Sequence, residues 1–145
     1  MFFFTSVAGD RYQTPALGRG VYNLSNMYSA QLLDHFQNPR NAGDVADPDA
    51  IAEIENPACG DVLRLSLKIK SGRIAEIRFK AKGCVPSMAC ASALTELVAG
   101  QTLDDSRSLH RETLIAAVGG LPQASTHAAQ LALDTLAAAL RQVKP

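Results

Sequence analysis

Residues 63–82 read Leu-Arg-Leu-Ser-Leu-Lys-Ile-Lys-Ser-Gly-Arg-Ile-Ala-Glu-Ile-Arg-Phe-Lys-Ala-Lys, and this stretch decides the fold. Apolar and polar residues alternate strictly over residues 63–70, and they alternate again over residues 77–82. Such alternation is the period of a β-strand with one buried face. The dipeptide Ser71-Gly72 suits a two-residue turn. The stretch therefore predicts an antiparallel hairpin with one face toward solvent.

The segments on either side of the hairpin complete an α+β domain. Residues 51–55 are a candidate third strand, and Tyr28, Leu32 and Phe36 recur every four residues, as on a short amphipathic helix that ends before Pro39. After the hairpin, helices are expected over three runs, which are 86–99, 113–118 and 128–143. Strands followed by helices predict a small antiparallel three-stranded sheet covered on one face by helices.

Composition limits the possible functions. The 145 residues are 47% hydrophobic, which is enough for one domain with a real core. Fourteen basic residues balance fourteen acidic ones without a basic run, so neither nucleic acid nor an anionic membrane is an expected partner. Three irregularly spaced cysteines without a convincing secretion signal predict reduced thiols, and hence the cytoplasm.

Residues 1–26 are expected to be a flexible extension that precedes a domain over 27–145. The apolar start is broken by Asp10 and Arg11 and is too short for a signal sequence or a membrane span. Glycine, proline and asparagine are frequent in the residues that follow it. Initiation at Met27 is an equally good account of this stretch.

Candidate ligands lie at the two ends of the hairpin. Cys59 and Asp61 are two residues apart in a turn at its entry, and Cys84 follows its exit, just before the helix expected from Pro86. The positive end of that helix predicts a lowered pKa for the Cys84 thiol. Because a hairpin folds back on itself, Cys59 and Cys84 are expected to be neighbours. Taken singly, Cys59 could be an inert small residue and Asp61 an ordinary turn residue.

The three histidines and the third cysteine are predicted to have different roles. His127 falls in or just before the first turn of the last helix, where a neutral imidazole, the metal-binding form, is favoured. His35 and His110 are expected to be surface residues. Cys90 lies within an alanine-rich run and is interpreted as a core cysteine, with a reserve thiol as the alternative. The types of these residues and their expected places in the fold thus predict a metal site with thiolate character.

Four segments in order, together about four fifths of the chain, carry a resemblance to a known family. They are Tyr-Ser-Ala-Gln-Leu-Leu-Asp-His-Phe-Gln-Asn-Pro-Arg-Asn-Ala-Gly at 28–43, Asn-Pro-Ala-Cys-Gly-Asp at 56–61, Arg-Phe-Lys-Ala-Lys-Gly-Cys at 78–84 and Ala-Ser-Ala-Leu-Thr-Glu-Leu-Val-Ala-Gly-Gln-Thr at 91–102. In these segments the sequence resembles the U-type iron-sulfur cluster assembly scaffolds, the IscU/SufU/NifU N-terminal family.

The resemblance implies a carrier rather than an enzyme. Such a scaffold holds iron, zinc or a nascent [2Fe-2S] cluster, receives sulfur from a cysteine desulfurase and passes the cluster to acceptor apo-proteins, as a monomer or homodimer. It implies Cys59, Cys84 and His127 as ligands and Asp61 as the residue that keeps the cluster labile.

Two departures from the family pattern leave alternatives open. Ala128 stands where the family has a third cysteine, and Leu-Pro-Gln-Ala-Ser at 121–125 replaces a Leu-Pro-Pro-Val-Lys stretch that is read by a chaperone. One alternative is therefore a zinc- or iron-binding protein that no longer builds clusters and modulates a desulfurase. Another is a thiol enzyme with Cys84 as nucleophile and His127 as base, although no further acid or base group supports it.

Overall fold

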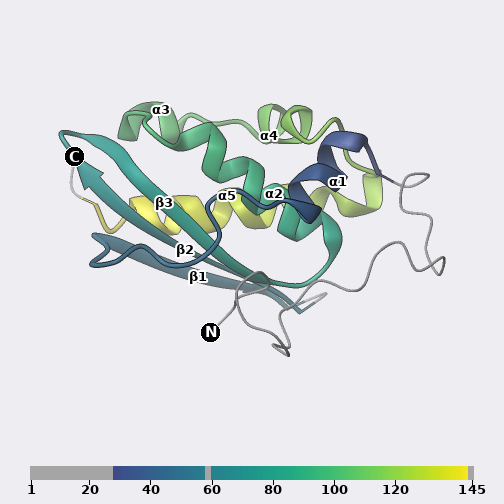
Figure 1. Cartoon of the computed structure of the whole chain (residues 1–145), viewed down its shortest axis with the longest axis horizontal. Coiled ribbons are helices and arrows are strands. Elements are labelled where there is room, and N and C mark those ends of the chain that lie inside the picture. Colours follow the sequence, from purple (N-terminus) through teal and green to yellow (C-terminus); the bar gives the residue numbers. More distant parts are fainter. Residues whose placement is uncertain (1–27, 58–59, 144–145) are drawn as a thin grey trace.

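The computed structural model describes residues 28–57 and 60–143, which form an α+β fold, as the sequence predicts (Figure 1). The elements are α1 (Ala30–Gln37), β1 (Ala50–Asn56), β2 (Asp61–Lys70), β3 (Arg73–Lys82), α2 (Val85–Val98), α3 (Leu103–Arg107), α4 (Arg111–Ala117), the short 3-10 helix η2 (Gln123–Ser125) and α5 (Thr126–Leu140). The expected elements are confirmed to within a few residues. Helix α3 was not expected, because five residues are too few to show a helical period. The extension expected over 1–26 lies outside the described residues.

The three strands form one antiparallel sheet in the order β1-β2-β3. Ser71 and Gly72 both have positive φ angles, 54° and 72°, which fits the tight turn that joins twisted antiparallel strands. Leu65 and Leu67 of β2 are paired with Phe79 and Ile77 of β3, and all four side chains are at most 1% exposed. These residues are part of the hydrophobic core.

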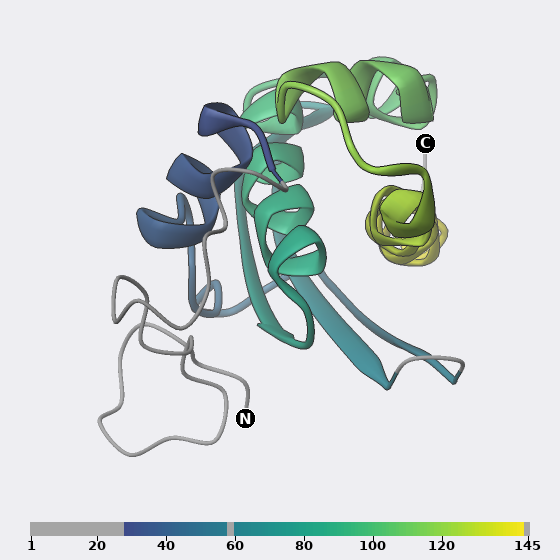
Figure 2. The same cartoon turned by 90° about the vertical axis from the view of Figure 1, so that its right-hand side faces the viewer.

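Helices α2 and α5 cover one face of this sheet, α2 over β3 and α5 over β1 and β2 (Figure 2). Helix α2 is also packed against α1, α4 and α5, and eleven of its fourteen residues are buried. A helix enclosed on so many sides has no polar stripe, which explains its run of small and apolar residues. Within the described ranges, no helix has both the length and the apolar character needed to cross a membrane.

Helix α1 buries one side against α2, and His35 lies on that side. His35 is 7% exposed, its Nδ1 lies 2.8 Å from Ser92 Oγ, and its Nε2 lies 3.5 Å from Glu96 Oε1. The prediction that His35 is a surface residue is wrong, because the buried stripe of α1 is wide enough to include the residue before Phe36. His110 is exposed, as expected.

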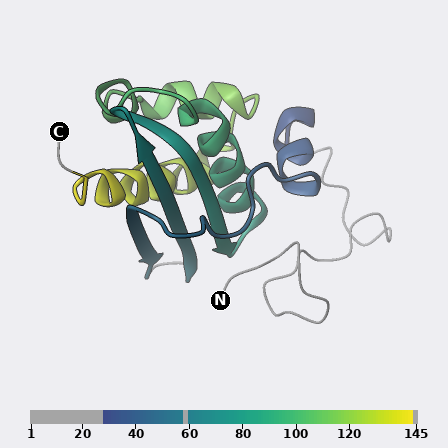
Figure 3. The same ribbon diagram turned by 60° about the vertical axis from the view of Figure 1, so that its left-hand side comes forward.

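The other face of the sheet is only partly open. Residues 42–49 cross it from the β3 edge to the start of β1 (Figure 3). On the way, the Asp44 carboxylate forms ion pairs with Lys80 and, at 3.5 Å, with Arg64, and Lys80 is left only 2% exposed. The expectation that this face of the hairpin is turned toward solvent is therefore wrong where the segment covers it.

Candidate metal site at one end of the sheet

Asp61 opens β2 at the end of the sheet where β3 leaves it. Val62 is paired with Lys82, so the chain that continues to Gly83 and Cys84 passes directly beside Asp61. The Asp61 residue is only 3% exposed. A buried carboxylate needs hydrogen-bond donors around it, and these donors come from the start of α2.

Both carboxylate oxygens of Asp61 accept hydrogen bonds from the first turn of α2. The Cys84 backbone N–H donates to Oδ1 at 3.1 Å, and the Ser87 hydroxyl donates to Oδ2 at 2.6 Å. The Cys84 thiol donates to Oδ2 at 3.3 Å, and its sulfur lies 3.2 Å from Ser87 Oγ. The structure therefore brings together two of the residues expected in the site, Asp61 and Cys84.

Cys84 is the N-cap residue of α2, and its side chain is partly exposed. Burial raises the pKa of the Cys84 thiol, and the adjacent Asp61 carboxylate raises it further, while hydrogen bonding to Ser87 acts in the opposite direction. The prediction that the helix terminus lowers this pKa is wrong for the protein alone. The dipole effect, about 1 kcal/mol or less, is outweighed by burial next to an anion. A cation bound to the sulfur would reverse this balance.

His127 reaches the same place from the first turn of α5. Its Nδ1 lies 3.2 Å from the Ala124 carbonyl oxygen, which can only accept, so Nδ1 carries the proton in this hydrogen bond. Nε2 then presents its lone pair, and it lies 3.6 Å from Asp61 Oδ2. This Nε2 atom is inaccessible to solvent and has no hydrogen-bond partner within the part of the chain that the structure describes. The imidazole is therefore oriented as a metal ligand would be.

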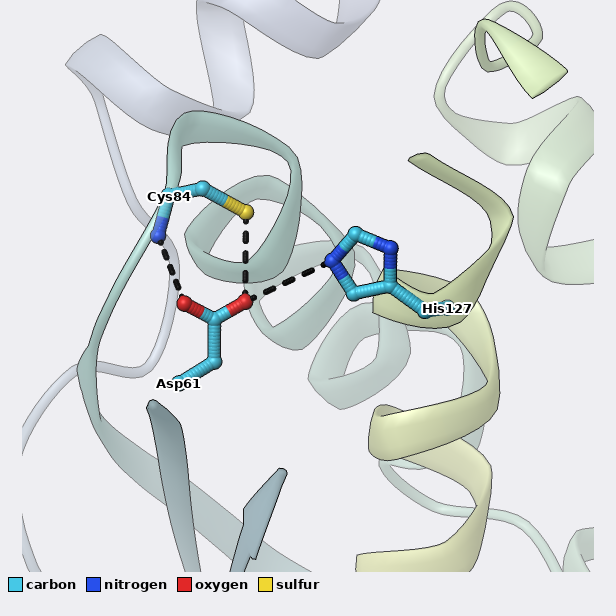
Figure 4. Close-up of side chains that lie close together, drawn as sticks. All are labelled: Asp61, Cys84 and His127. Atoms are coloured by element: carbon cyan, nitrogen blue, oxygen red, sulfur yellow. Dashed lines mark hydrogen bonds and ion pairs between the residues drawn. The ribbon is translucent and has the colours of Figure 1, made fainter. Parts of the chain in front are cut away.

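Asp61, Cys84 and His127 each offer one ligand atom, and these atoms all lie within 4.8 Å of one another (Figure 4). Oxygen, sulfur and nitrogen donors at such separations suit iron or zinc. Cys59, the fourth expected ligand, lies outside the described residues, as does its expected proximity to Cys84. His127 also lines an open depression of ≈ 250 Å³ between Asn56 and Pro57 at the end of β1 and Gln130 of α5.

Comparison with known sequences places this site in a family. The sequence model of the NifU-like N-terminal domain matches residues 27–144. The chain belongs to this family. The match includes the whole described part of the structure, so the site lies within the NifU-like domain.

Two relatives are named as iron-sulfur cluster assembly scaffold proteins. IscU 1 of Archaeoglobus fulgidus is 40% identical over 114 residues, which cover 79% of this chain and 74% of the relative. IscU of Azotobacter vinelandii is 40% identical over 121 residues, which cover 81% of this chain and 94% of the relative. These names agree with the prediction of a carrier rather than an enzyme.

A solved structure supports the fold of this NifU-like domain. The N-terminal part of a NifU-like protein from Brucella abortus superimposes with a TM-score of 0.66, covering 82% of this chain and 95% of that one. At 22% sequence identity, this likeness concerns the fold alone.

Cys90 and Ala128 are both part of the core of the NifU-like domain. Cys90 is 0% exposed, and burial, together with the charge of Cys84, raises the pKa of its thiol to about 12. The interpretation of Cys90 as a core cysteine is confirmed. Ala128 is 1% exposed, so the position next to His127 faces into the packed side of α5.

Sequence reasoning missed two residues close to the site. Ser87 is 5% exposed and contacts both Asp61 and Cys84. The only signal for Ser87 is its place three residues after Cys84, one helical turn further along. Tyr28 is the second: burial, and then the charge of Cys84, raise the pKa of its phenol. Nothing in the spacing of the sequence links Tyr28 to the site.

Proposed function

We propose that this protein is a scaffold that binds iron or a nascent [2Fe-2S] cluster and transfers it to acceptor proteins. The observation that carries the proposal is the convergence of Asp61, Cys84 and His127 within 4.8 Å in a chain of the NifU-like family. The cluster is the cargo of the protein, so the site has to release it as well as hold it.

The donor set suits a cargo that must leave. Cys59 and Cys84 would supply thiolates, His127 a neutral imidazole and Asp61 a carboxylate, which makes four ligands. A carboxylate is a harder and weaker partner for iron than a thiolate. With Ala128 in place of a third cysteine, the site has fewer thiolates with which to retain its cargo.

The partners follow from this role. We infer that a cysteine desulfurase supplies the sulfur and that apo-proteins with unoccupied cysteine ligands accept the cluster. The reducing cytoplasm suits this work, because free thiols persist there. The same donors also suit zinc, which accepts sulfur, nitrogen and oxygen ligands.

Anaerobic reconstitution tests the proposal. The purified full chain is given ferrous iron, a cysteine desulfurase, cysteine and a thiol reductant, and visible absorbance is followed. We expect a sulfur-dependent chromophore that is lost in Cys84→Ala. Cys90→Ala is the matched control, because it also removes a thiol but from a fully buried position. Stoichiometric zinc without a chromophore under any condition would contradict the proposal and favour a metal-binding protein that does not build clusters.

A further inference from the structure

Ser87 holds a central place in the site, although neither the sequence patterns nor the proposed ligand set includes it. Its side chain leaves the first turn of α2 and is 5% exposed. Its hydroxyl oxygen lies 2.6 Å from Asp61 Oδ2 and 3.2 Å from Cys84 Sγ. One hydroxyl therefore contacts the ligand atoms of two different candidate ligands, which come from different elements.

The Asp61 oxygen that Ser87 binds is the one that faces the site. Oδ1 is directed to the Cys84 backbone, whereas Oδ2 is approached by the Cys84 thiol at 3.3 Å and by His127 Nε2 at 3.6 Å. When Cys84 binds a metal as a thiolate, its S–H bond is lost and it no longer donates to Oδ2. The Ser87 hydroxyl then remains as a neutral donor beside two anions that would otherwise repel each other.

We infer that Ser87 is a positioning residue for metal binding, which fixes the Asp61 carboxylate and the Cys84 sulfur relative to each other. Hydrogen-bond partners of metal ligands typically change metal affinity by 10- to 100-fold when they are removed. This inference rests on the proposed function, because it requires Asp61 and Cys84 to be ligands. Ser87 would affect metal binding through Asp61 and Cys84, without being a ligand itself.

A matched pair of substitutions separates the hydroxyl from the shape of the side chain. Ser87→Thr keeps the hydroxyl and Ser87→Val has nearly the same shape without it, so any cost of the extra bulk is shared. Ser106→Ala is the control for loss of a buried serine hydroxyl, because Ser106 is 2% exposed and donates to the Thr102 carbonyl, away from Asp61 and Cys84. Thermal unfolding of each variant reports whether it is folded.

The measurements are anaerobic titrations of the full chain with Zn(II) and Co(II) against a chromophoric chelator. We expect Ser87→Val to bind each metal about 10- to 100-fold more weakly than Ser87→Thr and Ser106→Ala. We also expect the sulfur-to-cobalt charge-transfer band to shift in Ser87→Val only, because the hydroxyl that lies 3.2 Å from the Cys84 sulfur is then missing. A merely structural role would not move this band.

Two results would overturn the inference in distinguishable ways. If all four proteins bind both metals with equal affinity and the same spectrum, Ser87 has no positioning role and the proposed function stands. If neither the unaltered protein nor Ser87→Thr binds Zn(II), Co(II) or iron, the proposed function fails, and the role of Ser87 fails with it.

Discussion

The Asp61 carboxylate occupies the space in which a side chain on Gly83 would begin. A Cβ atom on Gly83 would lie 2.2 Å from Asp61 Oδ1 and 2.6 Å from its Cγ. Gly83 also has a φ angle of 150°, which residues with a side chain rarely adopt. The close approach of β2 and the start of α2 at the site therefore depends on glycine at this position.

Gly83→Ala should move Asp61 out of the site as well as strain the backbone. We expect a loss of unfolding free energy above the roughly 1–2 kcal/mol that an unfavourable positive φ costs, together with weaker zinc binding in a chelator competition. Gly100→Ala is the control, because its φ is 81° and no atom lies within 4 Å of the added Cβ. Equal effects of both substitutions on zinc affinity would contradict the steric argument.

His127→Ala should weaken metal binding with little effect on folding. The side chain is 37% exposed and its Nε2 faces Asp61, so its removal takes away a ligand without opening a cavity in the core. We expect zinc affinity to fall by more than the 10- to 100-fold typical of a lost outer partner. His110→Ala, at an exposed position, should bind as the unaltered protein does. Unchanged affinity in His127→Ala would remove this histidine from the ligand set.

The sheet and its helices could be predicted because their sequence periods are strong. The alternation around Ser71-Gly72 specifies the hairpin, and the register then follows from which residues can be buried. The path of residues 42–49 over the sheet could not be predicted, because it depends on the pairing of Asp44 with Lys80, two charged residues far apart in sequence. An ion pair between residues far apart in sequence leaves no periodic signal.

The site could be predicted only as far as chain topology constrains it. The closeness of Asp61 and Cys84 follows from the geometry of a hairpin, because its entry and its exit lie at the same end of the sheet. The pKa of Cys84 depends on burial and on the Asp61 carboxylate, which no local pattern reveals. Ser87 and Tyr28 were missed for the same reason, since each owes its place to tertiary packing. A lone histidine is usually a surface residue, so the burial of His35 could not be predicted from the sequence, although the buried stripe of α1 includes it.

The burial of His35 predicts a stability that falls with acid. Burial, followed by the charge of Arg40, lowers the pKa of His35, although Glu96 and Asp34 act in the opposite direction. The unfolded chain therefore takes up a proton near pH 6.5, before the folded protein does. Stability should be fully present above about pH 6.5 and should decline as the pH falls toward the lower folded pKa, by at most about 1.4 kcal/mol per pH unit.

Urea unfolding at several pH values between neutrality and pH 5 checks this expectation. His35→Gln should flatten the slope in that range, because glutamine can still bond Ser92 but takes up no proton. His110→Gln should leave the slope unchanged. A slope that persists in His35→Gln would assign the acid sensitivity to other groups.

Cys90 should be unreactive in the folded protein. With a thiol pKa of about 12 and no exposed surface, only about one molecule in 10,000 carries the reactive thiolate at pH 8. We expect iodoacetamide to label the partly exposed Cys84 faster than Cys90, which should react only after unfolding in urea, as read by peptide mass spectrometry. Equal labelling of both residues in the native protein would show that Cys90 is an accessible reserve thiol.

Ala128→Cys should lengthen the life of a bound cluster. The substitution restores a thiol at the position next to His127 where the family pattern has one, and a third thiolate binds iron more firmly than a carboxylate does. Ala129→Cys is the matched control, because Ala129 is 0% exposed on the same helix but is turned about 100° away. Both variants should lose about 1–3 kcal/mol of stability from overpacking. Slower decay of the reconstituted chromophore in Ala128→Cys alone would show that a missing thiol, and not the fold around it, limits how long the cargo is held.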